Sequence, residues 1–321
     1  MTNLTRRNFA LAGLSGTAAL GLTASATSAS AAGHAPANPP AMFDAPLGRY
    51  RITAIFDGMM PLEKSLFFGA EQAAIDAALA AAGVAGDGLS APVNTFLLQS
   101  DDRTVLIDAG LGELNMFGPG FGRLTAGLAA AGVAPEDVDM IVATHAHPDH
   151  IGGLVAGGAA VFANAELLIS DVDHGFWSDA ANMAQAPAEA QGMFSLAQHV
   201  FAAYGDRLRP VAAGTEVAPG MTLELSPGHT PGHSVVHIDG GDRQLMMVAD
   251  AVLYADLQTA LPAAGSDFDA DPALAAQSRA RIFDRAATDG LLIAATHVHF
   301  PGFGRFVTDA GAYRFVPASW M

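Results

Sequence analysis

Short apolar segments recur along the chain and alternate with longer, alanine-rich segments. Apolar and polar residues alternate at 50–57, as in a half-buried strand, and the runs at 95–99 and 104–108 flank a polar turn that predicts a hairpin. Other apolar runs of strand length lie at 139–144, 166–170, 221–226, 234–238, 244–248 and 291–295. Helices are predicted at 71–82, 121–131, 188–204 and 271–287, and another is expected to open at Ile151. This alternation predicts an α/β fold in which helices cover the outer faces of two mixed sheets.

The N-terminal segment has the layout of an export signal. Arg6-Arg7 precede an apolar stretch at 9–22, and Ala-x-Ala sites follow at 24–26 and 29–31. We therefore predict a twin-arginine signal peptide at 1–31 and a periplasmic or secreted protein, with a signal anchor or a disordered tail as the alternatives. The apolar stretch is shorter than the roughly 20 residues that span a bilayer, and no later segment is long and apolar enough to do so.

Composition narrows the possible domains and partners. Residues 32–48 are rich in Ala, Pro, Asn and Gly and are expected to form a flexible leader, which leaves 49–321 as the folded domain. A hydrophobic content of 51% is enough for a substantial core. The net charge of −17 disfavours nucleic acids and anionic membranes as partners. Because the chain has no cysteine, any metal must be held by histidines and carboxylates.

Potential metal ligands follow four of the predicted strands directly. They are the segment His145-x-His147-x-Asp149-His150, and then His229, Asp250 and His297. Pro148 interrupts the first segment, and a backbone that turns there can send His145 and His147 to one side and Asp149 and His150 to the other. A single histidine is usually structural or merely exposed, but four potential ligands in six residues predict a metal site, and two neighbouring ions fit this arrangement better than one.

Taken together, these motifs resemble the metallo-β-lactamase superfamily. The resemblance rests on the segment 145–150, on Pro227-Gly228-His229-Thr230-Pro231-Gly232-His233, on Asp250 and His297 after strands, and on Leu106-Ile107-Asp108-Ala109-Gly110. Within the superfamily the chain looks most like methyl parathion hydrolase and related lactonases, through segments such as Phe117-Gly118-Pro119 and Phe300-Pro301-Gly302-Phe303-Gly304. The resemblance implies a four-layer αβ/βα sandwich that takes up nearly all of the chain after the signal.

The resemblance also implies a ligand set for two divalent ions, with zinc preferred and cobalt, manganese or iron as alternatives. His145, His147 and His229 would hold one ion, Asp149, His150 and His297 the other, and Asp250 would bridge them. Asp108 and His233 are expected to orient the ligands by contacting ring nitrogens that do not bind metal, although His233 could instead be an ordinary turn residue. His299 could compete with His297, because two residues that are two positions apart in an extended segment point the same way.

The implied reaction is hydrolysis. Two ions that share a water lower its pKa, which implies a metal-bridging hydroxide with Asp149 and Asp250 as catalytic residues. Phe117, Trp177 and Phe194 fall at the places of the family's aromatic pocket, but ordinary core packing is the alternative for all three. Trp177 is expected in a polar loop at 174–179, which favours the pocket role for this residue. The resemblance further implies a possible homodimer.

Substrate and activity are less constrained by the sequence. No cluster of Lys or Arg accompanies the aromatic residues, which predicts a small, neutral, apolar substrate: a lactone, an aryl ester or an organophosphate triester. A thioesterase of the glyoxalase II kind and a non-catalytic metal-binding protein of the same fold are the alternatives.

Overall fold

The computed structural model describes residues 40–319. The predicted signal peptide at 1–31 lies outside these residues, as do residues 32–39 of the expected leader, so these segments stay predictions. Within the described part of the chain, no helix is long and apolar enough to cross a membrane.

Two seven-stranded sheets form the centre of the fold. In spatial order, the first contains β1 (Met42–Leu47), β2 (Tyr50–Glu63), β4 (Gly88–Gln99), β5 (Thr104–Ile107), β6 (Met140–Val142), β9 (Glu166–Ser170) and β10 (Leu208–Val211). The second contains β11 (Thr215–Ala218), β12 (Met221–Leu225), β13 (Ser234–Asp239), β14 (Gln244–Met247), β16 (Leu292–Ala294), β17 (Phe303–Asp309) and β18 (Ala312–Pro317). Both sheets contain parallel and antiparallel pairs, which confirms the predicted mixed sheets.

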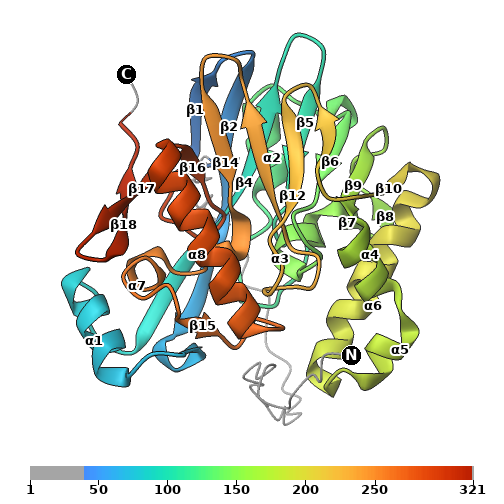
Figure 1. The fold of residues 1–321 in the computed structure, drawn as a ribbon. Helices are drawn as coiled ribbons and strands as arrows, with labels where there is room; N and C mark the ends of the chain where they lie inside the picture. Colours follow the sequence, from blue (N-terminus) through green and yellow to red (C-terminus); the bar gives the residue numbers. More distant parts are fainter. Residues whose placement is uncertain (1–39, 320–321) are drawn as a thin grey trace, which may run out of the picture.

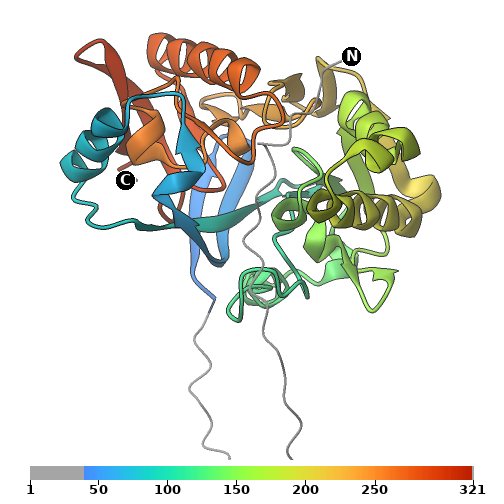
Figure 2. The same ribbon diagram turned by 90° about the horizontal axis from the view of Figure 1, so that it is seen from below.

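Helices cover the outer face of each sheet, as the views in Figures 1 and 2 show. The helices are α1 (Gln72–Ala81), α2 (Leu124–Ala130), α3 (Pro148–Ile151), α4 (Asp171–Ser178), α5 (Ala180–Gln185), α6 (Ala188–Tyr204), α7 (Ala255–Gln258) and α8 (Pro272–Asp289). α2 and α6 pack on the first sheet, and α8 packs on the second. The fold is therefore the predicted four-layer sandwich, and α1 and α7 form a smaller cluster with the far ends of β2 and β4.

The space between the sheets is filled by alternating apolar side chains from both. Ile52 and Ile107 of the first sheet lie in the same buried cluster as Leu223, Val236 and Met247 of the second. Burial on both faces explains why the central strands are nearly continuous apolar runs in the sequence. Two short sheets, β3 (Phe67–Phe68) with β15 (Gly265–Ser266) and β7 (Val155–Ala156) with β8 (Ala159–Ala160), lie outside this sandwich.

The prediction of a flexible leader at 32–48 is partly wrong. Residues 42–47, which belong to the predicted flexible segment 32–48, form β1 and pair antiparallel with β2. Ala45 and Leu47 are buried, and Gly48 has the positive φ of 59° that a tight hairpin turn favours. The folded domain therefore begins before residue 49, and an Ala/Pro-rich composition concealed a short edge strand.

Two local predictions near the histidine cluster also need correction. The helix expected to open at Ile151 already begins at Pro148, because a proline is well placed in the first turn of a helix and His147 forms the N-cap. Trp177 was expected in a polar loop, but it lies in α4, whose N-cap Ser170 accepts a hydrogen bond from the backbone N–H of Asp173.

Candidate metal centre

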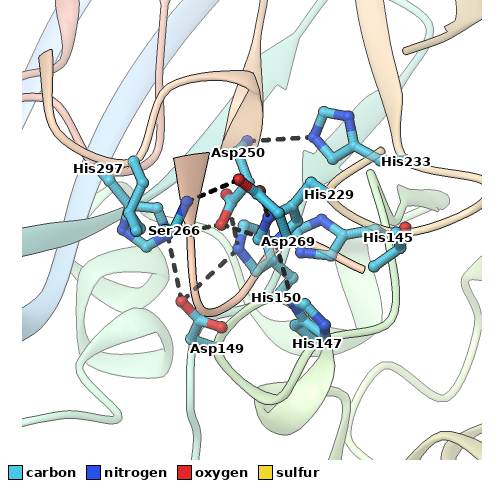
Figure 3. Close-up of polar contacts among 12 residues, drawn as sticks. His145, His147, Asp149, His150, His229, His233, Asp250, Ser266, Asp269 and His297 are labelled. Carbon is cyan, nitrogen blue, oxygen red and sulfur yellow. Dashed lines mark hydrogen bonds and ion pairs between the residues drawn. The ribbon is translucent and has the colours of Figure 1, made fainter. Parts of the chain in front are cut away.

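Seven titratable side chains converge at one end of the sandwich, in loops that follow strands (Figure 3). Four come from the segment after β6, and one each from the loops after β12, β14 and β16: His145, His147, Asp149, His150, His229, Asp250 and His297. All seven are buried. Loops that a rigid sheet holds in place are where functional side chains are commonly positioned, so this placement is the one expected of a functional site.

The segment that follows β6 is held by backbone hydrogen bonds to two buried carboxylates. The backbone N–H of Thr144 donates to Asp108 Oδ1 at 2.8 Å, and that of Ala146 donates to Asp173 Oδ2 at 2.9 Å. Pro148 then begins α3, which carries Asp149 and His150. The change from extended chain to helix at this proline separates the two pairs of ligands, as the turn at Pro148 predicts.

His145, His147 and His229 form the first group. Their ring nitrogens lie within 4.8 Å of one another, and His229 Nε2 is 3.0 Å from His147 Nδ1. Asp149, His150 and His297 form the second group under the same distance limit. In it, Asp149 Oδ2 lies 3.3 Å from His297 Nε2 and 3.6 Å from His150 Nε2.

The carboxylate of Asp250 lies between the two groups. Its Oδ1 is 3.0 Å from His150 Nε2, and its Oδ2 is 3.3 Å from His229 Nε2 and 3.2 Å from His297 Nε2. A single carboxylate thus reaches ligands of both groups. This is the position that a bridging ligand must occupy.

The chemistry of these atoms fits divalent metal ions. Three buried polar atoms of the cluster have no hydrogen-bond partner of suitable geometry in the described chain: His145 Nε2, His150 Nε2 and Asp250 Oδ1. Buried polar atoms are normally satisfied, so atoms of this kind that converge require another partner. Ligand atoms at about 2.1 Å from a tetrahedral Zn²⁺ lie about 3.4 Å apart, close to the distances observed here. Imidazole and carboxylate without thiolate are also a suitable ligand set for zinc.

Both residues predicted to support the ligands contact the cluster. Asp108 Oδ2 lies 2.8 Å from His150 Nδ1 and also accepts from the Thr144 hydroxyl, so it fixes the orientation of the His150 ring. His233 makes no direct contact with a ligand side chain through its nitrogens. Its Nδ1 lies 3.0 Å from the Ser226 carbonyl, and its Nε2 accepts from the backbone N–H of Asp250 at 3.1 Å. Burial lowers the pKa of His233 to about 3, which keeps this ring neutral and able to accept.

Asp269 is a supporting residue that the sequence analysis missed. Its Oδ1 lies 3.0 Å from His229 Nδ1, and its Oδ2 accepts from the backbone N–H of Ser266. The carbonyl of Pro92 plays the equivalent part for His297, at 2.8 Å from Nδ1. Asp269 follows only the two-residue strand β15, which no apolar run marks in the sequence, and it is 40 residues from His229, so no spacing in the sequence points to it.

Replacing Asp269 with alanine should weaken zinc binding by about 10- to 100-fold, because His229 loses the acceptor that fixes its tautomer and orientation. Competition with a chromophoric chelator measures this change. Asp267→Ala, two residues earlier on the same loop, is the matched control and should keep the parent affinity. An Asp269→Ala protein with the parent affinity would show that Asp269 does not support the metal ligand.

Protonation of the histidines depends on their carboxylate neighbours. Burial by itself lowers the pKa of His297, but the carboxylates of Asp250 and Asp149 overcome it and raise that pKa to about 10. Burial likewise opposes the charged form of His150, whose pKa Asp250, Asp149 and Asp108 nevertheless raise well above its usual value. Burial, reinforced by the neighbouring His229, lowers the pKa of His147 to about 3.

Zinc should therefore displace protons when it binds to the metal-free protein at pH 8, about one each from His150 and His297, since a ring nitrogen binds metal only when it is deprotonated. Because the pKa of His297 is raised, its ion pairs stabilise the metal-free fold fully below pH about 6.5, and this contribution is lost as the pH rises towards 10. Calorimetric titration in two buffers of different ionisation enthalpy counts the protons. Equal heats in both buffers would contradict the expectation.

An apolar pocket opens onto the cluster and contains about 640 Å³ of space, part of it open to solvent. Outside the cluster, its wall consists of seven apolar residues and one carboxylate: Met60, Met116, Phe117, Pro148, Met193, Leu253, Phe268 and Asp267. No Lys or Arg of the described chain is among the lining residues. An apolar concave wall beside a few convergent polar groups is the usual form of a small-molecule site.

Of the three aromatic residues predicted to line the pocket, the structure places only Phe117 there. Trp177 is 1% exposed and packs on Phe194 at 4.6 Å between ring centroids, and both belong to the core under α6. The rings of Trp177 and His147 pack edge to face, at 5.6 Å between centroids. The pocket role predicted for Trp177 and Phe194 is therefore corrected to core packing, which was the alternative.

His299 does not compete with His297. Its side chain is 72% exposed and forms an ion pair with Asp256 at 3.2 Å, whereas the His297 ring is buried in the cluster. The chain does not continue as a strand at this point, because β16 ends at Ala294. The two histidines therefore need not point the same way.

Comparisons with known proteins agree with the fold and the site. The model of the metallo-β-lactamase superfamily matches residues 90–297, which include all seven residues of the cluster. An N-acyl homoserine lactonase of Bacillus cereus is 26% identical over 213 residues, which are 60% of this chain and 77% of the lactonase.

Two solved structures resemble most of the described chain. The hydrolase AbOPH of the β-lactamase superfamily is 29% identical with a TM-score of 0.82, over 87% of this chain and 98% of that one. AidC, a dizinc quorum-quenching lactonase in complex with a product, is 26% identical with a TM-score of 0.80, over 88% and 99% of the two chains. With a family model that matches well over half of its length, this chain belongs to the metallo-β-lactamase superfamily.

Proposed function

We propose that this protein is a dinuclear metal-dependent hydrolase of neutral lactones that carry an apolar acyl chain, with aryl esters and organophosphate triesters as neighbouring substrate classes. The observation that carries the proposal is the Asp250 carboxylate, which lies between two groups of three ligands at the floor of an apolar pocket. The lactonase activities of the Bacillus cereus enzyme and AidC support the choice of lactones.

Two bound divalent ions would supply a hydroxide nucleophile near neutral pH and polarise the carbonyl group that it attacks. The seven-residue cluster would hold the ions, while Asp108, Asp269 and the Pro92 carbonyl keep the rings of His150, His229 and His297 in place. These supports prepare the site before substrate arrives, so little reorganisation is needed during the reaction.

Asp149 is the residue best placed to handle a proton. Like Asp250 it is a carboxylate of the cluster that lines the pocket, but unlike Asp250 it belongs to only one of the two ligand groups. Burial would raise the pKa of its carboxyl group, but the neighbouring His150 and His297 lower that pKa to about 2, so the group is ionised at neutral pH. An ionised carboxylate at this boundary can accept a proton from the nucleophile and pass it to the leaving alkoxide.

The pocket and the ligand set each disfavour one of the two alternative functions. A thioesterase of the glyoxalase II kind acts on an anionic thiol moiety and needs cationic side chains. No Lys or Arg of the described chain lines this pocket. A non-catalytic relative is expected to have lost ligands, whereas all seven are present and converge.

A substrate panel on the zinc-loaded protein tests the proposal. We expect the highest kcat/KM for an N-acyl homoserine lactone, lower values for phenyl acetate and a diethyl aryl phosphate, and the lowest for an acyl glutathione thioester. A preference for the thioester would favour the first alternative. No turnover of any of the four by protein with two ions per chain would favour the second.

Asp267→Asn should lower the KM for an anionic ester by about three- to tenfold and leave that for a neutral lactone unchanged. Asp267 is the one carboxylate on the pocket wall outside the cluster, and its side chain forms no hydrogen bond or ion pair within the described chain. Burial raises the pKa of this carboxyl group. Steady-state kinetics with a neutral and an anionic ester of the same alcohol measures the change, and an equal shift of both KM values would contradict it.

A further inference from the structure

Asp57 is a buried carboxylate that lies outside the metal centre. It belongs to β2, at the point where the pairing with β4 shifts register between Phe56 and Gly58. Asp57 is therefore left without a partner in the neighbouring strand, and its side chain is 0% exposed. A carboxylate in this environment is tolerated only when several donors satisfy it.

Its donors are three backbone N–H groups from the two ends of one loop. Leu111 donates to Oδ2 at 2.9 Å, and Arg123 and Leu124 donate to Oδ1 at 2.7 and 3.2 Å. Leu111 follows the loop that contains Asp108, and Leu124 is the first residue of α2. The carboxylate thus joins two points of the chain that are 13 residues apart.

The two ends of this loop lie close to each other and to Asp57. A Cβ on Gly122 would lie 2.4 Å from the Gly112 carbonyl oxygen, and a Cβ on Gly110 would lie 2.4 Å from Cγ of Asp57. Close backbone approaches of this kind require glycine. Residues 112–122, which we call the rim loop, are therefore a compact surface loop whose ends meet above Asp57.

The rim loop provides one side of the substrate pocket. Met116 and Phe117 line the pocket, and Met116 is 43% exposed. Phe121 packs against Phe117 at 5.8 Å between ring centroids, and its ring covers Gly58, where a Cβ would lie 2.3 Å away. The same bulge of β2 therefore holds the rim loop through the Asp57 carboxylate and supports its aromatic residues through Gly58.

We infer that Asp57 is a positioning residue that determines substrate selectivity: by closing the rim loop, it holds Phe117 against the apolar part of the substrate. Asp57 itself touches neither the metal ligands nor the pocket. The effect on selectivity rests on the proposed function, whereas the anchoring of the loop does not. The two parts can therefore be tested separately.

Hydrogen exchange of the zinc-loaded protein tests the anchoring. Asp57→Asn preserves size but turns one acceptor into an NH₂ group that faces backbone donors, so at least one of the three hydrogen bonds is lost. We expect amides at 112–122 to exchange about tenfold faster, with the metal content unchanged. Asp101→Asn, in the exposed hairpin turn, is the matched control and should exchange like the parent. Unchanged exchange in Asp57→Asn would overturn the inference.

Kinetics with long and short N-acyl homoserine lactones tests the selectivity. Asp57→Asn should reduce the preference for decanoyl over butanoyl substrate several-fold, through KM. In a Phe117→Ala background it should have no further effect, because its consequence is transmitted through Phe117. Met193 lines the pocket from α6, so in a Met193→Ala background the effects of Asp57→Asn and Met193→Ala on the chain-length preference should add. An equal loss for both chain lengths, or additivity with Phe117→Ala, would overturn the selectivity role.

A second variant covers the case in which Asp57→Asn does not fold. Phe121→Ala loosens the same loop without touching the buried carboxylate, so it should also accelerate exchange at 112–122 and reduce the chain-length preference. Parent-like exchange in this variant would overturn the inference. If the parent protein hydrolyses no lactone, the proposed function fails, but the exchange experiment still decides whether Asp57 anchors the loop.

Discussion

Replacing Asp250 with alanine should lower turnover by at least about 10³-fold and leave fewer than two metal ions per chain. The carboxylate lies within 3.3 Å of His150, His229 and His297, so its loss removes a ligand from both groups at once. A 10³-fold loss corresponds to about 4 kcal/mol of barrier, which is a reasonable contribution for metal-assisted catalysis. Elemental analysis of the purified variant and initial rates with the parent's best substrate measure the two effects.

Asp256→Ala is the matched control for this variant. Asp256 lies six residues further on, in α7, and its carboxylate pairs with the exposed His299 rather than with the cluster. The control should keep two ions and parent activity. An Asp250→Ala protein that retains both ions and turnover would show that Asp250 does not bridge a catalytic centre.

Replacing Trp177 with alanine should lower the free energy of unfolding by about 3–5 kcal/mol, which is typical of the loss of a large buried aromatic residue. The ring packs on Phe176 and Phe194 and against His147. Its Nε1–H donates to Asp173 Oδ2 at 3.1 Å, so the cavity would also leave a buried carboxylate short of one donor. Chemical denaturation of the zinc-loaded protein measures the loss.

Trp177→Phe separates packing from hydrogen bonding, because it keeps most of the ring volume but removes the donor. We expect it to cost about 1–3 kcal/mol, less than the alanine variant. Parent stability in Trp177→Ala together with a raised KM would instead restore the pocket role that the sequence suggested for this residue.

Asp173 connects the core around Trp177 to the loops that carry the metal ligands. Its Oδ2 accepts from the Ala146 backbone, and its Oδ1 accepts from the Thr230 hydroxyl at 2.6 Å and the Gly232 backbone at 3.0 Å. One buried carboxylate therefore joins the loop of His145 and His147 to the loop of His229. Burial raises its pKa, while the four donors oppose that shift. The fourth of these donors is the indole N–H of Trp177.

The metal cluster was predictable because its signals are local. His145, His147, Asp149 and His150 lie within six residues, and His229, Asp250 and His297 each follow an apolar strand closely. The central strands were predictable for the same reason, since burial on both faces makes them continuous apolar runs. The edge strands β1, β10, β11 and β18 were missed, as was β17 beside β18, because their exposed positions dilute that pattern.

Features that depend on distant partners could not be predicted. Asp269 supports His229 from 40 residues away, and its own neighbours in the sequence are a turn and a helix cap. Trp177 has polar neighbours in the sequence, yet it is buried because α4 turns that side of the helix towards α6. Asp57 looks like the end of an ordinary strand, and only the fold shows that it closes a loop that begins over 50 residues later.

The central claim is that this chain holds two metal ions between the identified groups. An anomalous difference map from crystals of the zinc-loaded protein, collected at the zinc edge, tests it most directly. We predict two peaks about 3.5–4 Å apart, one beside His145, His147 and His229 and the other beside Asp149, His150 and His297, with Asp250 between them. A single peak, or a peak away from these residues, would contradict the dinuclear centre.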